Sequence, residues 1–109
     1  MNEDGRGEIM TQQQKAQQQI QIKVPDEISR GVYCNMMIVR HTKEEFIMDF
    51  VFVTPPTGIL TSRVIMSPGH MKRTVSALHE NLGKYEKEIG KIEAAPEPTT
   101  KGRIGFVKS

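Results

Sequence analysis

Four stretches in the middle of the chain are rich in apolar residues, and in the first of them apolar and polar positions alternate, which is the spacing of a half-buried β-strand. These stretches are residues 20–24, 32–41, 45–53 and 59–66. The turn Thr42-Lys43-Glu44 separates the second from the third. Two prolines lie between the third and the fourth, and they indicate a turn because proline cannot pair inside a sheet. The pattern predicts an antiparallel meander of four strands.

A helical pattern follows the fourth stretch. Ser67-Pro68 predicts a helix start, a capping hydroxyl followed by proline in the first turn. Apolar residues then recur at intervals of four and three, and Gly90 predicts the stop. They are Met71, Val75, Leu78, Leu82, Tyr85, Ile89 and Ile92. We therefore expect an α+β domain in which one long C-terminal helix lies along one face of the four-stranded meander.

The third stretch is apolar on both of its faces, and this bears on function. Phe46, Met48, Phe50 and Phe52 form one face, and Ile47, Asp49, Val51 and Val53 form the other. One helix covers one face, so we expect a second copy to cover the other, which predicts a homo-oligomer. The expected interface residues are Tyr33, Asn35, Ile47, Val51 and Val53. Asn35 is expected to fix strand register or an interface.

The two ends differ from this middle. Residues 1–18 are rich in glutamine and contain almost no large apolar side chains, which predicts a tail that is disordered or at best a frayed helix. Met10 is an alternative start to Met1. Residues 93–109 begin with a Pro/Ala/Glu/Thr run, which predicts a flexible C-terminal tail. Its last apolar residues, up to Val107, suit either a docking peptide or a loose end. A single domain is thus expected over residues 19–92.

Short motifs in this domain resemble a known family. They are Tyr33-Cys34-Asn35, Glu45-Phe46, Asp49-Phe50, the run Arg63-Val-Ile-Met-Ser-Pro-Gly-His70, and Leu78, Asn81-Leu82 and Tyr85-Glu86. Together they resemble small prokaryotic proteins classed as domain of unknown function 3467. The resemblance implies no particular activity. The order of strands and helix is similar to the SecB export chaperone subunit in topology alone.

Candidate chemistry is sparse. The three histidines and the single cysteine, Cys34, lack metal-ligand spacing, and no catalytic or phosphate-binding motif is present. We expect no metal, no cofactor and no enzyme activity, and we expect Cys34 to be buried. The helix start is unusual because it carries cations where the helix dipole favours acids. Arg63, Ser67, His70, Lys72 and Arg73 are therefore a candidate anion or partner site. The alternative is a structural basic turn paired with Glu44, Glu45 or Asp49.

The chain of 109 residues has a net charge of +2 and no apolar run of membrane-spanning length. We expect a cytoplasmic bacterial protein with no membrane contact. The leading hypothesis is an oligomeric binding or adaptor module that takes a protein partner or client, in the manner of a chaperone. Surplus apolar sheet surface and seven methionines favour it. The alternative is a nucleic-acid-binding or regulatory protein that uses the basic helix start, supported by a sequence pI near 8.8.

Overall fold

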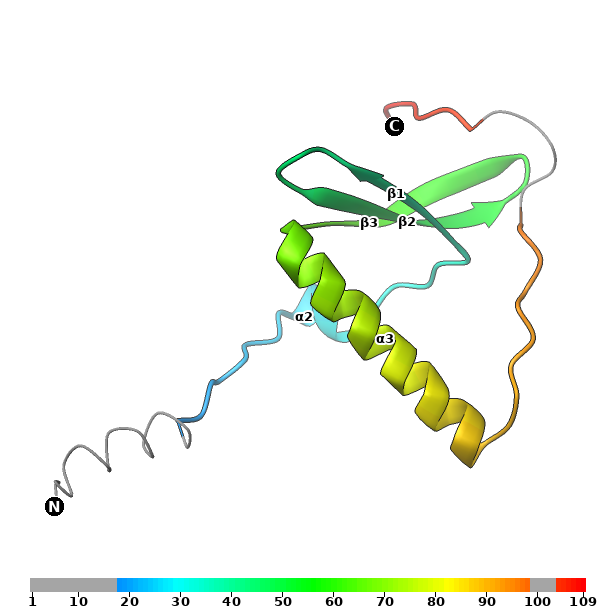
Figure 1. The fold of residues 1–109 in the computed structure, drawn as a ribbon. Coiled ribbons are helices and arrows are strands. Elements are labelled where there is room, and N and C mark those ends of the chain that lie inside the picture. Colours follow the sequence, from blue (N-terminus) through cyan, green and yellow to red (C-terminus); the bar gives the residue numbers. More distant parts are fainter. Residues whose placement is uncertain (1–17, 99–103) are drawn as a thin grey trace, which may run out of the picture. The chain divides into compact units, whose positions relative to one another are not determined.

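A computed structural model describes residues 18–98 and 104–109 of the chain (Figure 1). Its elements are α2 (Asp26–Ser29), β1 (Met36–His41), β2 (Phe46–Thr54), β3 (Thr57–Met66) and α3 (Pro68–Glu88). The chain divides into two compact units, Met1–Gly31 and Val32–Ser109. The second holds an antiparallel sheet of three strands followed by α3, so the fold is α+β. The expected tail over residues 1–18 lies, apart from residue 18, outside the described residues.

The prediction of a fourth strand over residues 20–24 is wrong. Ile20, Ile22 and Val24 are 60–86% exposed and belong to no strand. Alternation makes a segment suitable for a sheet, but a strand forms only where a neighbour satisfies its backbone groups. The chain turns instead into the short helix α2, which begins after Pro25 and ends before Gly31 at a φ of 74°.

The sheet has the order β1-β2-β3, and its turns follow from local chemistry. The Thr42 hydroxyl accepts the backbone N–H groups of Glu44 and Glu45, which closes the β1–β2 turn as predicted. Pro55 and Pro56 form the β2–β3 turn, and β3 begins at Thr57, two residues before the predicted start. The β2–β3 register shifts between Phe50 and Val51, because Thr61 on β3 has no paired residue on β2. β1 begins only at Met36, so the second stretch pairs over a shorter range than expected.

The register confirms the two apolar faces of β2 and extends them across the sheet. One, here named the helix-side face, combines Met37, Val39, Phe46, Met48, Phe50, Phe52, Ile59, Val64 and Met66. The other, the tail-side face, combines Met36, Ile38, Arg40, Ile47, Asp49, Val51, Val53, Leu60, Arg63 and Ile65. Among the described residues only Met48, Val51 and Asp49 are buried, and all three belong to β2. The core is therefore very small.

α3 begins and ends where the sequence predicts. The Ser67 hydroxyl accepts the backbone N–H of His70 at 3.2 Å, and Pro68 is the first helical residue. Ile89 caps the other end, and Gly90 follows with a φ of 154°. Since proline has no N–H to lose and glycine tolerates positive φ, both boundaries follow from residue type alone.

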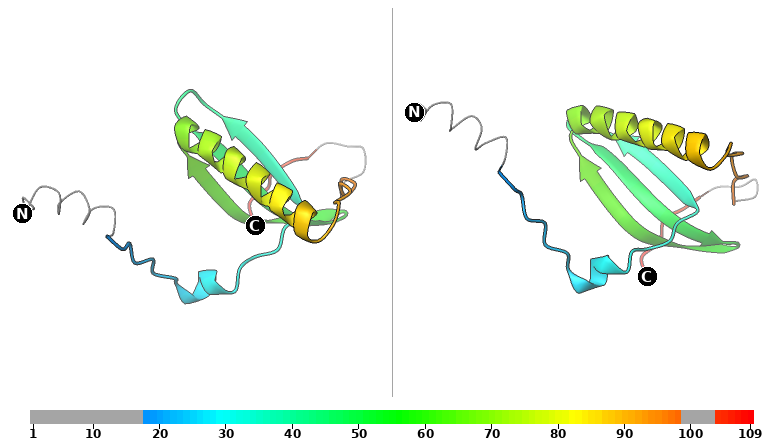
Figure 2. Two further views of the ribbon diagram at one scale, coloured as in Figure 1. Left: turned by 60° about the horizontal axis from the view of Figure 1, so that its bottom comes forward. Right: turned by 90° about the horizontal axis from the view of Figure 1, so that it is seen from below.

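The predicted packing of α3 along the sheet is only partly present. The helix lies on one side of the sheet (Figure 2), and the Thr74 hydroxyl near its start contacts the Met66 sulfur at 3.4 Å. Farther along, however, Val75, Leu78 and Leu82 are 54–61% exposed, and no residue of α3 is buried. The apolar stripe that predicted a packed helix is thus present but largely uncovered within this chain.

Asn35 provides a test of how the edge of the sheet is held. Its side-chain amide donates to the Val53 carbonyl at 3.0 Å and accepts from the Val53 N–H at 2.9 Å, so the side chain extends the β1–β2 ladder. Asn35→Ala should lower the free energy of unfolding by about 1–2 kcal/mol, the net value of two such hydrogen bonds. Urea denaturation at a fixed protein concentration measures this. Cys34→Ala, at an exposed neighbour, is the control and should be neutral; equal stabilities for the two variants would contradict the role of Asn35.

Candidate functional site

Asp49 is the most deeply buried side chain of the sheet, with no exposed surface. The Arg63 guanidinium donates two hydrogen bonds to its carboxylate, from Nε to Oδ1 at 2.6 Å and from Nη2 to Oδ2 at 2.9 Å. Arg40 Nη1 lies 3.2 Å from the same Oδ2. Cross-strand register explains the cluster, because Asp49 stands opposite Arg63 on β3 and diagonally opposite Arg40 on β1, two residues along from its direct partner Ile38. Three strands are thereby tied together through one carboxylate.

The two arginines set the charge state of this carboxylate. Hydrogen bonds from Arg63 lower the pKa of Asp49, and the positive charges of Arg63 and Arg40 act in the same direction, while burial opposes them. The carboxylate in turn raises the pKa of Arg63. With two cations and one anion, the cluster has a net charge of +1 (2 − 1), and both arginine side chains remain 44% exposed.

The five candidate anion-site residues do not gather at one point. Ser67 caps α3 through His70, and Arg73 Nη2 donates to His70 Nδ1 at 3.0 Å, since a guanidinium can only donate. Lys72 and Arg73 border a shallow depression on α3. Arg63, by contrast, is hydrogen-bonded to Asp49. Asp49 is one of the three acids that the alternative, a structural basic turn, offered as partners. The anion site stays a prediction for the helix start, now without Arg63 as a free cation.

The five candidate interface residues divide between the two sheet faces. Tyr33 is 75% exposed and its ring meets Phe52 edge-on, with centroids 5.7 Å apart, on the helix side. Asn35 is used for strand register, as the sequence allowed. Ile47, Val51 and Val53 belong to the tail-side face, where Val51 is buried and the other two are partly covered. The five residues therefore do not lie on one face of the sheet.

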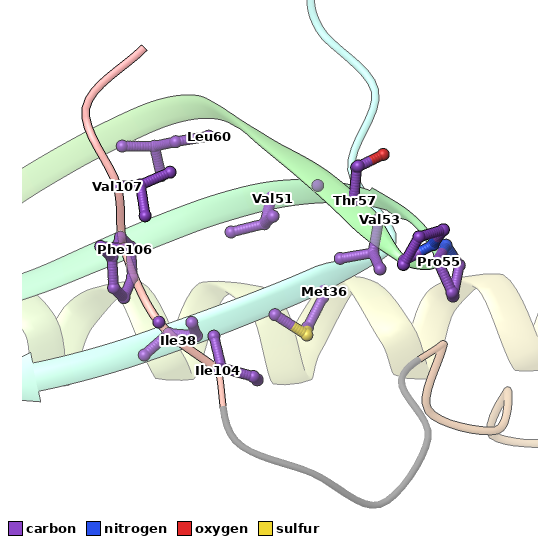
Figure 3. A pocket seen from close by; sticks show the side chains of 13 residues that line it. Met36, Ile38, Val51, Val53, Pro55, Thr57, Leu60, Ile104, Phe106 and Val107 are labelled. Atoms are coloured by element: carbon purple, nitrogen blue, oxygen red, sulfur yellow. The ribbon is translucent and has the colours of Figure 1, made fainter.

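A groove crosses the tail-side face, and the chain's own C-terminal residues lie over it (Figure 3). It has a volume of about 370 Å³. Strand residues including Met36, Ile38, Val51, Val53 and Leu60 line one wall, and Ile104, Phe106 and Val107 line the other. Arg40 adds a cation–π contact, its guanidinium carbon 5.9 Å from the centre of the Phe106 ring. The sequence pointed to this segment as a docking peptide or a loose end, but it held no signal for which surface the segment meets.

Other chemistry is limited. Within residues 18–98 and 104–109, no group of three or more His, Cys, Asp or Glu side chains comes together as a metal site. Cys34 is exposed, so the expectation of a buried cysteine is wrong, because β1 begins two residues beyond it. None of the helices in the described part of the chain is long and apolar enough to cross a membrane.

Comparison with known proteins identifies the family. The model of the family described as "Protein of unknown function (DUF3467)" matches residues 6–94. This confirms the resemblance seen in the sequence motifs and covers both the sheet and α3. No curated protein and no solved structure matches the chain.

The ion-pair cluster predicts a specific pH dependence of stability. The pKa of Asp49 is lower in the folded than in the unfolded chain, so the pair stabilises the fold above the unfolded pKa of about 3.9 and this stabilisation is lost as the pH falls through the folded value. Asp49→Asn should be less stable than the parent at pH 7, and the difference should shrink towards pH 2. Urea midpoints measured between pH 2 and pH 7 test this.

The control for that series is Glu80→Gln, at an exposed helix position whose contact with Lys84 is 4.0 Å long. This variant should follow the parent at every pH, because exposed pairs contribute little. A difference between the parent and Asp49→Asn that stays constant down to pH 2 would show that the variant acts through packing and not through the charge.

Proposed function

This chain belongs to the DUF3467 family, whose description names no activity, and we propose a role from the surfaces of the chain itself. We propose that the protein is a non-enzymatic homo-oligomeric binding module for protein clients. The observation that supports this most directly is the uncovered apolar stripe of α3. Val75, Leu78, Leu82 and Tyr85 are 45–61% exposed. Met37, Val39 and Val64 on the helix-side face are 36–49% exposed as well. Large exposed apolar patches on small proteins are typical of interaction surfaces.

A second copy of the chain suits this surface. Intervals of four and three residues put the stripe on one side of the helix, as in helices that pair with one another. The charges of α3 are also unevenly spread. Residues 68–78 carry Lys72 and Arg73 and no acid, a charge of +2, whereas residues 79–88 carry three acids and two lysines, a charge of −1 (2 − 3). Antiparallel pairing of two α3 helices would place each basic start beside the other's acidic end.

This arrangement also accounts for cations at a helix start, where the dipole disfavours them. A cost of about 0.3–1 kcal/mol for each cation is offset if a neighbouring helix supplies the acids that the first turn lacks. SecB-like client holding is the finer form of the proposal. The likeness to the SecB subunit rested on four strands before the helix, whereas the sheet has three, so this finer form rests on the exposed apolar surface alone. The nucleic-acid alternative rests on the same cations and is separated from oligomerisation by the variants below.

Removing the apolar stripe should dissociate the oligomer. Leu78→Ser with Leu82→Ser deletes two central stripe residues, and light scattering at micromolar concentration should show the parent as a dimer or larger and this variant as a 12.3 kDa monomer. Glu80→Ser with Lys84→Ser, on the opposite side of the helix, is the matched control and should keep the parent mass. The proposal predicts that the parent delays aggregation of reduced insulin chains. A monomeric parent would contradict the oligomer.

Reversing the charges of the helix start separates the two functions. Lys72→Glu, at a position that flanks the stripe, should weaken self-association about tenfold, or ~1.4 kcal/mol, since a symmetric pair contains the contact twice. Adding Glu86→Lys, which flanks the stripe on the same side, should restore it. Sedimentation at low and high salt measures both, and the fold should be no less stable, because acids suit a helix start. Loss of nucleic acid binding in gel shifts, with self-association unchanged and no rescue, would favour the alternative.

A further inference from the structure

The tail-side face is covered by the C-terminal segment of this chain, whereas α3 lies on the helix-side face. The C-terminal residues approach it from the side of the sheet opposite α3 (Figures 1 and 3). Phe106 and Ile104 lie over the strand that carries Ile38, and Val107 points towards Leu60 on β3 (Figure 3). The segment is extended and belongs to neither a helix nor a strand.

This cover is held loosely. Ile104 is 54% exposed, Phe106 53% and Val107 90%, so each apolar side chain keeps half or more of its surface in water. Among the described residues no hydrogen bond joins residues 104–109 to the sheet. The contact consists of apolar side chains and the Arg40 guanidinium over the Phe106 ring. An occupant held this way is easily exchanged.

The charges are also unfavourable for this occupant. Arg40 and Arg63 leave the tail-side face with a net charge of +1 around Asp49, and no acid other than Asp49 stands at a paired position of this face. The C-terminal segment itself carries three cations over residues 101–109 and no acidic side chain. Its apolar residues therefore fit the groove while its flanking charges oppose it.

We propose that the tail-side groove binds an extended segment of a partner protein that has apolar residues in the pattern Ile-x-Phe-Val and acidic flanks, and that Ile104–Val107 covers it in cis until such a segment displaces it. The inference rests on the proposed binding function and names the site and the ligand class. Met36 in the groove supplies an adaptable apolar wall, which suits a site that takes more than one sequence. The tail then acts as an internal competitor that lowers the affinity for weak ligands.

The experiment compares the full-length parent with the full-length variant Ile104→Ser, Phe106→Ser, in which the groove is vacated. The probe is the fluorescent peptide EGEIGFVES, and its basic counterpart KGRIGFVKS, residues 101–109, is the second ligand. The variant should bind the acidic peptide about tenfold more tightly than the parent. The tethered tail has an effective concentration of about 1 mM, and if its own Kd for the groove is near 100 µM, it weakens peptide binding to the parent by the ratio of the two values. The basic peptide should bind more weakly than the acidic one, and added salt should narrow the gap.

A second pair of variants locates the site within the vacated chain. Leu60→Ser removes a groove residue that is 40% exposed, and it should weaken peptide binding about fivefold through lost apolar contact. Ile59→Ser, its neighbour on the helix-side face and 67% exposed, should leave peptide binding unchanged. Both positions are exposed enough for the chain to keep its fold, which thermal melts verify.

Three results would overturn the proposal. They are no peptide binding by the vacated variant up to millimolar concentration, equal binding by parent and variant, and a changed oligomeric mass for the variant. The last would mean that the segment docks on a second copy. Failure of the proposed function gives a different result, since neither a monomeric parent nor a parent that fails to delay insulin aggregation changes the comparison of peptide binding between parent and variant.

Discussion

Cover for a sheet with two apolar faces is the constraint on which this structure depends. The sheet has three strands, and its central strand, β2, holds every buried residue of the described chain. One helix and one short C-terminal segment are available to shield the two faces. Neither is enough, because residues 54–61% exposed remain on α3 and residues 53–90% exposed remain on the tail. A core this small makes an isolated chain marginal, and further burial has to come from another molecule.

The Asp49 cluster shows how the sheet keeps its geometry without a deep core. A carboxylate with no exposed surface joins cations from β1 and β3, so the three strands are fixed by directional bonds where apolar packing is thin. A buried charge is tolerated only when it is paired and hydrogen-bonded, and the bidentate grip of Arg63 meets that requirement. The same cluster gives the tail-side face its positive charge, which links the stability of the sheet to the ligand preference of the groove.

Local chemistry made the strands from Met36 to Met66 and the limits of α3 predictable. Thr42, the two prolines, Ser67 and Gly90 each act within a few residues of themselves, so the sequence alone was sufficient. The absence of a strand over residues 20–24 and the incomplete packing of α3 were not predictable. Both depend on whether another part of the structure lies beside the segment to pair or pack with it. Arg63 was misplaced for the same reason. Its neighbours in the sequence are the cations of the helix start, but its neighbour across the strands is Asp49.

The two covers differ in strength, and this difference gives them different roles. Burying a large apolar side chain completely stabilises by about 1.5–3 kcal/mol, so the half-covered Ile104 and Phe106 together contribute about 1.5–3 kcal/mol. Fixing the backbone of even two residues costs about 2–4 kcal/mol, so the net free energy of docking is small. The apolar stripe of α3 is longer than the apolar part of the tail. Pairing of two copies would bury one stripe from each copy, and no new segment has to be ordered because the helix is already formed. Physical chemistry therefore favours a lasting association through α3 and a reversible one through the C-terminal segment.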